Sequence, residues 1–127
     1  MFNSESPREL YELYFVFACI WAFGSTLSFE AGNNIRLEFS LWWNNEFKAV
    51  RFPSIASAPT VFDYFIDPDT NTLAPWTDRV PKFDPDPDLP VYSSLVPTAQ
   101  TTCIRYFVDL LVKEQQPVLL VGPSGCG

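Results

Sequence analysis

The chain contains the stretch VLLVGPSGCG at residues 118–127. Four apolar residues run directly into a glycine-rich segment that matches the start of the phosphate-binding pattern G-x-x-x-x-G-K-[ST]. In such a loop, successive backbone N–H groups surround an anion, and glycines let the chain bend sharply and approach the phosphate closely. The candidate loop residues are Gly122, Pro123, Ser124, Gly125, Cys126 and Gly127.

The residues before this loop have the order that a phosphate-loop core requires. Pro97 and Thr98 begin a predicted helix, and Pro117 begins a predicted buried strand at 118–121. The apolar positions of that helix follow helical spacing and are Ile104, Phe107, Val108, Leu111 and Val112. Helix, strand and glycine loop in this order favour a phosphate-loop NTPase over the alternative, a flexible glycine-rich tail.

Two helices are predicted in the first fifty residues. Ser6-Pro7-Arg8-Glu9 is typical of a helix start, with an N-cap serine and a glutamate three residues later, and predicts a helix over 6–29. The break Gly32-Asn33-Asn34 precedes a second helix over 34–50. An apolar stripe along the second helix indicates a packing surface, and its members are Ile35, Phe39, Trp42, Trp43, Phe47 and Val50.

The first predicted helix is apolar on nearly every face, so it requires cover on several sides. Residues 13–29 carry no charge. The length of this uncharged run is close to the lower limit for a membrane-spanning helix, which needs about 17–25 residues. Glycine, serine and threonine dilute this run, and acidic residues precede it. A buried helix is therefore favoured, and a small membrane-anchored protein that uses residues 10–29 is an alternative.

The middle of the chain predicts a hairpin followed by a linker. Residues 60–66 are β-prone, Asp67-Pro68-Asp69-Thr70-Asn71 is a dense turn signal, and the chain returns as a strand up to Trp76. Pro75 restricts the second strand to an edge or places it at a strand end. Residues 77–94 are rich in proline and aspartate and predict an extended linker. The prolines of this segment are incompatible with the spacing of an EF-hand calcium loop, so no metal site is predicted.

Composition restricts the classes of function. Fifteen acidic and eight basic residues give a net charge of −7, which disfavours binding to nucleic acid. The chain has no histidine, the commonest general base and metal ligand. Its three cysteines have no C-x-x-C spacing, so a disulfide framework has little support and a reducing compartment fits better.

Four stretches together resemble dynein heavy chains, most closely the axonemal outer-arm type. They are LYFVFACIWAFG (13–24), EFSLWWNNEFKAVRFPS (38–54), TVFDYFIDPDTNTLAPWTDRVPKF (60–83) and LVPTAQTTCIRYFVDLLVKEQQPVLLVGPSGCG (95–127). The resemblance covers nearly the whole chain in the family's order. It implies an α+β fragment in which residues 1–94 are the lid and extension of the second AAA+ module. Residues 95–127 would then begin the α/β core of the third module, up to its Walker A motif.

The resemblance also implies a function and its surroundings. It suggests that Val96, Pro97 and Thr98 lie near the adenine edge of the third nucleotide site, whose state regulates microtubule release by the main ATPase module. The parent would be an ATP-driven microtubule motor that uses ATP or ADP with Mg²⁺. Its partners would be the rest of the ring, other dynein chains and microtubules. Its location would be the cytoplasm and cytoskeleton, in the axoneme of a cilium or flagellum.

The pattern stops one residue before its lysine, so we expect a piece of a longer polypeptide. No Walker A lysine or threonine and no Walker B acid is present, and the 127 residues alone are expected neither to bind nucleotide nor to hydrolyse ATP. We assign no catalytic residue. The alternative is a standalone interaction module that docks through exposed aromatic helices at 11–29 and 35–47. The axonemal arm, ATP hydrolysis at the third site and the oligomeric state stay open.

Overall fold

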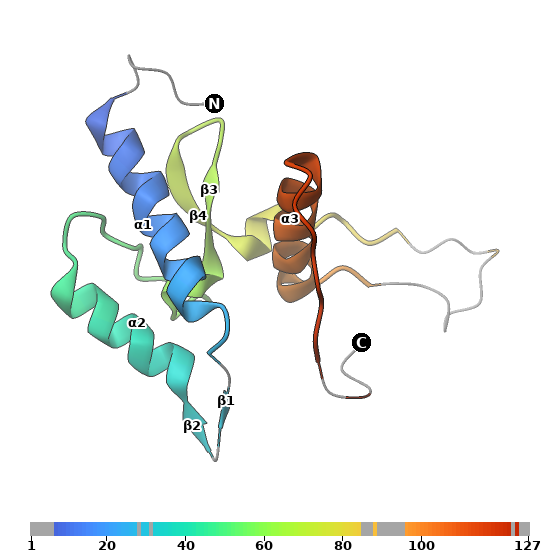
Figure 1. Cartoon of the computed structure of the whole chain (residues 1–127), viewed down its shortest axis with the longest axis horizontal. Coiled ribbons are helices and arrows are strands. Elements are labelled where there is room, and N and C mark those ends of the chain that lie inside the picture. Colours follow the sequence, from blue (N-terminus) through green and yellow to red (C-terminus); the bar gives the residue numbers. More distant parts are fainter. Residues whose placement is uncertain are drawn as a thin grey trace. The chain divides into compact units, whose positions relative to one another are not determined.

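The computed structural model describes residues 7–27, 29–30, 32–84, 88, 96–122 and 124. They form two compact units, residues 1–75 (unit 1) and 76–127 (unit 2) (Figure 1). Helices and short strands occur together, as the predicted α+β class requires. In chain order the elements are α1 (Arg8–Gly24), β1 (Phe29–Glu30), β2 (Asn33–Asn34), α2 (Ile35–Glu46), the 3₁₀ helix η1 (Val61–Asp63), β3 (Tyr64–Asp67), β4 (Thr72–Pro75), the 3₁₀ helix η2 (Trp76–Arg79) and α3 (Ala99–Lys113).

Helix α1 is shorter than the predicted 6–29. Ser6, the predicted N-cap, lies outside the described residues, and Pro7 takes the N-cap position, where its side chain makes no capping bond. The helix ends at Gly24, and the N–H of Ser25 makes the last helical bond, to the carbonyl of Trp21 at 3.1 Å. Residues 29–30 form a two-residue antiparallel ladder with residues 33–34.

Helix α2 starts where the sequence predicts and ends earlier. The side chain of Asn34 accepts a hydrogen bond from the backbone N–H of Leu37 at 3.2 Å, which satisfies one of the free donors of the first turn. Gly32, with φ of 86°, makes the preceding turn. Since the helix ends at Glu46, Phe47 lies beyond it and the predicted end at residue 50 is wrong.

A hairpin lies within the range that the sequence predicts, but its first strand is shorter than the β-prone stretch 60–66, because residues 61–63 form η1 and β3 begins only at Tyr64. Strands β3 and β4 are antiparallel, with Tyr64 opposite Pro75 and Asp67 opposite Thr72. In the turn, the Asp67 carboxylate accepts a hydrogen bond from the N–H of Asp69 at 2.9 Å, and Asn71 adopts a left-handed conformation with φ of 54°. Pro75 occupies the last position of β4, where its missing N–H does not interrupt the ladder.

The core of unit 1 forms where η1 meets both helices. Its buried members come from α1, α2 and η1, and are Ile20, Trp43, Val61 and Phe62. The Phe62 ring packs edge-on against Trp21, with the ring centroids 5.5 Å apart, and lies tilted against Phe39, with the centroids 5.6 Å apart. Figure 1 shows α1 lying beside the β3–β4 hairpin.

Two polar side chains connect these elements. Ser40 of α2 is 1% exposed. Its hydroxyl donates to the carbonyl of Arg36 at 2.8 Å and accepts from the N–H of Val61 at 3.1 Å, so the start of η1 is bonded to α2. Arg36 in turn donates to the carbonyls of Leu27 and Ser25, at 2.8 and 3.1 Å, and satisfies acceptors just after α1.

The apolar cover of α1 is incomplete. Phe15 and Phe23 are 70% and 71% exposed, as the all-round apolar pattern of this helix leads one to expect for a face without a partner. In the part of the chain that the structure describes, no helix is long and apolar enough to cross a membrane.

Unit 2 is built on helix α3. Trp76 of η2 is 3% exposed and packs on Tyr106 and Phe107 of α3, with ring centroids 5.3 and 6.3 Å away. Cys103 of α3 is buried as well. The 3₁₀ helix η2 lies in the region that the sequence predicts as the start of an extended linker.

The prediction of a buried strand at Val118–Val121 is wrong for this structure. These residues form no strand, and Leu119 and Val121 are 86% and 87% exposed. A strand needs a neighbour to receive its hydrogen bonds, and within the described residues both ladders are local hairpins in unit 1. The apolar run therefore has the composition of a buried strand without the sheet that would bury it.

Replacing Gly24 by alanine is expected to destabilise unit 1. A Cβ at this position would collide with the Phe62 ring, which cannot swing away because Trp21 and Phe39 hold it. We expect Gly24→Ala to lower the free energy of unfolding by about 1–3 kcal/mol, measured by urea denaturation followed by tryptophan fluorescence. The exposed neighbour substitution Ser25→Ala is the control, and equal stability of the two variants would contradict the packing described here.

Candidate functional site

The chain reverses direction between α3 and the glycine-rich segment. The N–H of Gln115 donates to the carbonyl of Val112 at 3.0 Å, and the N–H of Gln116 donates to that of Leu111 at 2.8 Å. These two bonds cap the C-terminus of α3, and Gln115 takes the left-handed backbone conformation that such caps use, with φ of 56°. In the view of Figure 1, the chain then runs back toward the end of α3 that carries Thr98.

Most of the predicted phosphate loop lies outside the described residues. Gly122 and Ser124 are described, whereas Pro123, Gly125, Cys126 and Gly127 are not. Gly122 and Ser124 are exposed. The structure thus gives the approach to the loop and leaves the loop itself as a prediction from the sequence.

The residues predicted at the adenine edge lie at the start of α3. The hydroxyl of Thr98 accepts from the N–H of Thr101 at 3.1 Å, and the N–H of Thr98 donates to the Thr101 hydroxyl at 2.9 Å. This reciprocal cap commits the Thr98 side chain to the helix start. Val96 is 55% exposed and Pro97 is half-buried.

A groove of about 450 Å³ lies between η2 and α3 in unit 2. Of the three adenine-edge residues, only Pro97 lines it. The other lining residues are Arg79, Pro81, Thr101, Thr102, Arg105, Tyr106 and Asp109. Its volume is within the range of about 300–1,000 Å³ that small-molecule sites occupy.

The charges around this groove are largely paired or stacked. The guanidinium of Arg79 lies 5.2 Å from the centroid of the Tyr106 ring, which is cation–π geometry. Arg105 and Asp109 form an ion pair at 3.5 Å across one helical turn, and both side chains are mostly exposed. Such an exposed pair within α3 contributes little to stability. The contacts between η2 and α3 come instead from the Trp76 ring and the Arg79 guanidinium.

Unit 1 contains an apolar groove of about 460 Å³. Its lining residues are Phe15, Val16, Cys19, Phe23, Phe39, Trp42, Trp43 and Phe47. All of these side chains are apolar or aromatic apart from the thiol of Cys19. This groove, which we call the α1–α2 groove, offers no acid–base group and is suited to apolar contact.

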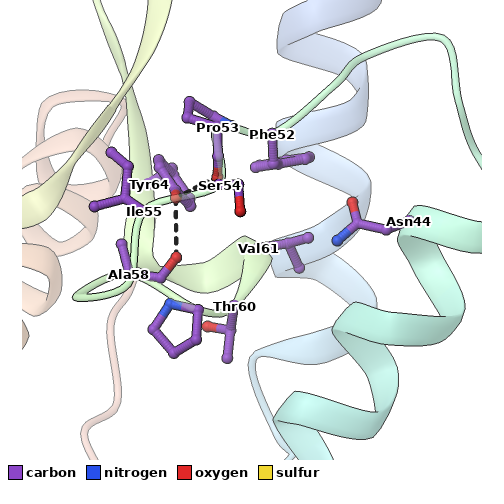
Figure 2. Close-up of a pocket in the computed structure, with 10 residues that line it drawn as sticks. Asn44, Phe52, Pro53, Ser54, Ile55, Ala58, Thr60, Val61 and Tyr64 are labelled. Carbon is purple, nitrogen blue, oxygen red and sulfur yellow. Dashed lines mark hydrogen bonds between the residues drawn. The ribbon is translucent and has the colours of Figure 1, made fainter.

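A smaller cavity of about 160 Å³ lies beside the segment that enters η1. Figure 2 shows the Tyr64 side chain pointing into it between Pro53 and Ala58. The Tyr64 hydroxyl donates to the carbonyls of Pro53 and Ala58, at 2.6 and 2.9 Å. Because a phenol has one hydrogen, the two acceptors share it. The cavity is smaller than typical ligand sites, and these bonds hold the 53–58 segment against β3.

The described residues offer little for metal chemistry. Within them, no three His, Cys, Asp or Glu side chains lie close enough together to hold a metal ion. Asp86 of the acidic linker lies outside the described residues, so the structure does not test the linker as a whole.

Comparison with known proteins assigns both halves of the chain. Residues 2–78 match the model of the dynein heavy chain AAA lid domain, and residues 83–127 match that of the P-loop containing dynein motor region. The chain belongs to the dynein heavy chain family. The resemblance found in the sequence is thereby confirmed.

Several similar curated proteins are dynein heavy chains with axonemal or ciliary names. The chain is 56% identical over 123 residues to dynein axonemal heavy chain 17 of Homo sapiens and 50% identical over 124 residues to dynein axonemal heavy chain 11 of Sus scrofa. It is 48% identical over 124 residues to the ciliary dynein beta chain of Tripneustes gratilla. Each match covers 97–98% of this chain, and the chain spans about 3% of the length of these relatives.

Sequence reasoning predicted the glycine loop, which the structure does not test, and missed the residues that shape the surroundings of α3. Neither η2 nor its contact with Tyr106 follows from hydrophobic periodicity, because Trp76 stands alone after a strand. The one signal that could have indicated it is a large aromatic residue next to the linker, since tryptophan is rarely left exposed.

Replacing Tyr64 by phenylalanine is expected to loosen the 53–58 segment. The change leaves two carbonyls without their donor and should lower the free energy of unfolding by about 1–3 kcal/mol. Urea denaturation near neutral pH measures this loss. The control is Phe52→Leu, because the Phe52 side chain lines the same cavity and makes no hydrogen bond, so this change measures the loss of packing alone.

The same variant should alter the response to alkali. Burial raises the pKa of Tyr64 above its ordinary value of 10.0, and the Asp63 carboxylate raises it further, while a backbone hydrogen bond at Ile55 lowers it. A raised folded-state pKa means that the stabilisation is complete below about pH 10 and is lost as the pH rises through the raised value. Denaturation between about pH 7 and pH 11 should show this loss in the native chain and a smaller one in Tyr64→Phe. Identical profiles would contradict it.

Proposed function

We propose that this chain is the part of an axonemal dynein heavy chain that joins the lid of the second AAA+ module to the start of the third. The observation that carries the proposal is the order of the two family matches, lid first and P-loop motor region second, with the glycine pattern at 122–127 inside the second. The apolar run before the glycines and the helix before that run have the order of a nucleotide-binding core.

The loop residues suit a nucleotide phosphate. Every residue from 122 to 127 except Pro123 has a backbone N–H, and three of the six are glycines without a side chain to obstruct the anion. The chain turns at Gln115, which has a left-handed backbone conformation, and the following residues lead to Gly122. Gly122 is exposed. In the parent, we propose that these N–H groups bind ATP or ADP, with Mg²⁺ balancing the phosphate charge.

The residues proposed at the base of the nucleotide are Val96, Pro97 and Thr98. Pro97 lines the groove of unit 2, and the exposed side chain of Val96 leaves an apolar surface beside it. The Thr98 hydroxyl is occupied by its cap, so this residue would contribute shape rather than a hydrogen bond. Nucleotide occupancy here would regulate the release of the microtubule by the main ATPase module.

The remaining proposals concern the whole heavy chain. Because the relatives carry axonemal and ciliary names, we propose a location in the axoneme of a cilium or flagellum, within the cytoskeleton. The motor activity would be ATP-driven movement along microtubules, in association with other dynein chains. The 127 residues alone would be inactive, since the lysine and the Ser/Thr of the pattern are not among them.

A second candidate function is docking of a partner protein by unit 1 itself. The α1–α2 groove supports it, because its apolar lining and the exposed rings of Phe15, Phe23 and Trp42 would bind an apolar surface. A standalone module of this kind would be a stable monomer with a defined partner. A fragment of a dynein motor would instead expose these aromatic side chains only when it is separated from the neighbouring parts of the heavy chain.

Replacing Gly127 by valine should abolish nucleotide binding at this loop. The experiment uses a motor region of human dynein axonemal heavy chain 17 in which these residues replace the matched segment. A side chain at the second glycine of the pattern would occupy the space of the phosphate, so affinity should fall at least about tenfold, or ~1.4 kcal/mol. Equilibrium dialysis should find one fewer Mg²⁺-nucleotide bound per motor.

The control substitution is Pro123→Ser, at a variable position of the pattern. It should leave the nucleotide stoichiometry unchanged. If the motor with the native loop bound no more nucleotide than the Gly127→Val variant, the nucleotide site would have to be abandoned.

The two candidate functions differ in the behaviour of the isolated 127-residue chain. The proposed function predicts that it binds a hydrophobic dye through the α1–α2 groove and self-associates. Phe23→Ser should reduce dye fluorescence, because this ring lines the groove and is 71% exposed. Phe83→Ser, at a half-exposed ring outside the groove, is the control. A monodisperse chain that unfolds cooperatively and binds no dye would favour the standalone module.

A further inference from the structure

The groove of about 450 Å³ in unit 2 runs along one continuous face of α3. The α3 residues that line it, at positions 101, 102, 105, 106 and 109, recur at helical spacing. This face is about 12 Å long, since a helix rises about 1.5 Å per residue. Arg79 and Pro81 line the groove from the segment of η2, which packs on α3 through Trp76. A polar helix face has thus gained a second wall, and we call the space between them the η2–α3 groove.

The charged side chains of the η2–α3 groove favour an anionic ligand. The guanidinium groups of Arg79 and Arg105 line it, and Asp109 is the one carboxylate among its described lining residues. Two positive charges and one negative charge leave an excess of one positive charge, whereas the whole chain carries a net charge of −7. The groove therefore differs in sign from the chain as a whole, and a ligand that accepts hydrogen bonds and carries negative charge would complement it.

Arg105 is the side chain best suited to bind such an anion. Its Nε lies 3.5 Å from Oδ2 of Asp109, and the two side chains are 82% and 69% exposed. This distance is longer than a good N–H···O hydrogen bond, which measures about 2.7–3.2 Å. Because an exposed pair of this kind contributes little to stability, an incoming carboxylate can compete with Asp109 for the guanidinium. A guanidinium binds a carboxylate through two parallel N–H bonds, which makes arginine selective for this group.

Flat apolar surfaces lie beside these charges. Pro81, Pro97 and the ring of Tyr106 line the groove, and the Arg79 guanidinium lies 5.2 Å from the centroid of that ring. The two prolines offer contact surface without a backbone N–H. The groove thus suits a ligand that joins a carboxylate to apolar groups. An extended peptide rises about 3.3 Å per residue, so the 12 Å face has room for about four residues of such a peptide.

The composition of the groove favours reversible binding over permanent cover. Permanent interfaces resemble a hydrophobic core, and the α1–α2 groove and the exposed run at 118–121 have that composition. The η2–α3 groove instead has exposed charges, Arg105 and Asp109, beside its apolar surfaces. Non-obligate interfaces have such a polar rim, and arginine and tyrosine are enriched in them.

We propose that the η2–α3 groove binds an extended acidic segment of a separate protein, with the Arg105 guanidinium bound to a glutamate or aspartate side chain of that segment. Apolar residues next to this carboxylate would contact Pro81, Pro97 and the Tyr106 ring. The site lies on described residues of unit 2 alone. It goes beyond the proposed function, because it does not depend on nucleotide binding at the loop.

The test measures photocrosslinking of a peptide to the chimeric motor region described above. The probe is Gly-Leu-Glu-Leu-Gly with a benzophenone at its N-terminus, and the matched control probe has glutamine in place of glutamate. The glutamate probe should crosslink saturably between residues 79 and 109, as mapped by mass spectrometry, with an affinity at least about fivefold above that of the glutamine probe. Because the contact is between charges, raising the salt concentration from about 50 to 300 mM should weaken it.

Substitutions in the Arg105–Asp109 pair should act in opposite directions. Arg105→Ala should weaken binding of the glutamate probe at least about fivefold, and Arg105→Lys should restore only part of it, since an ammonium lacks the paired N–H geometry. Asp109→Asn should strengthen binding about twofold, because it removes the competing carboxylate. If the pair were merely structural, both changes would act in the same direction.

The matched control for these variants is Arg8→Ala. Arg8 forms an exposed ion pair of the same spacing with Glu12 on α1, at 2.9 Å, but it is not among the residues that line a groove described above. Its replacement removes the same charge and the same type of pair. Binding of the glutamate probe should therefore stay unchanged, and a loss equal to that of Arg105→Ala would overturn the site.

Other occupants of the groove give different results, and each of these overturns the proposal. Equal crosslinking of the glutamate and glutamine probes would mean that the groove does not recognise charge. Displacement of the probe by inorganic phosphate at the same concentration would mean a site for a bare anion instead of a peptide. Crosslinking to the isolated 127-residue chain but not to the motor region would mean that the heavy chain itself fills the groove. None of these results bears on the nucleotide site, which the dialysis experiment tests separately.

Discussion

Unit 1 depends on the insertion of Phe62 between α1 and α2. Its ring contacts Trp21 of the first helix and Phe39 of the second, and the Arg36 guanidinium lies 5.1 Å from its centroid. The insertion is possible because Gly24 has no Cβ. Strand β3 follows η1 without a break, so the position of the ring also determines where the hairpin begins. The bond from Val61 to Ser40 then aligns this turn with α2.

The two units differ in how much of their apolar surface they cover themselves. Unit 1 has a closed core beside an open apolar groove, whereas unit 2 leaves the run at 118–121 exposed. Large exposed apolar patches mark interaction surfaces, ligand-binding grooves or sites of aggregation. In the proposed setting, the rest of a heavy chain supplies that cover.

Local sequence signals predicted what local interactions determine. The Asp- and Asn-containing turn at 67–71, the start of α2 at Asn34 and the start of α3 at Thr98 all depend on side chains within a few residues. The ends of α1 and α2 were predicted too late because hydrophobic periodicity continues past the last helical residue. The short helix η2 was not predicted, since its position depends on a ring thirty residues away, at Tyr106.

The same distinction applies to the candidate site. The glycine pattern was visible in the sequence, but a strand at 118–121 requires neighbours that the described chain does not provide. The proposed function implies that, inside a whole heavy chain, this run would pair with strands supplied by the rest of the core and the loop after it would bind a nucleotide phosphate. A cryo-electron microscopy map of the chimeric motor with Mg²⁺-ADP tests it most directly. The account predicts residues 118–121 buried in a parallel sheet and nucleotide density against 122–127, and an exposed run with no nucleotide beside it would contradict the account.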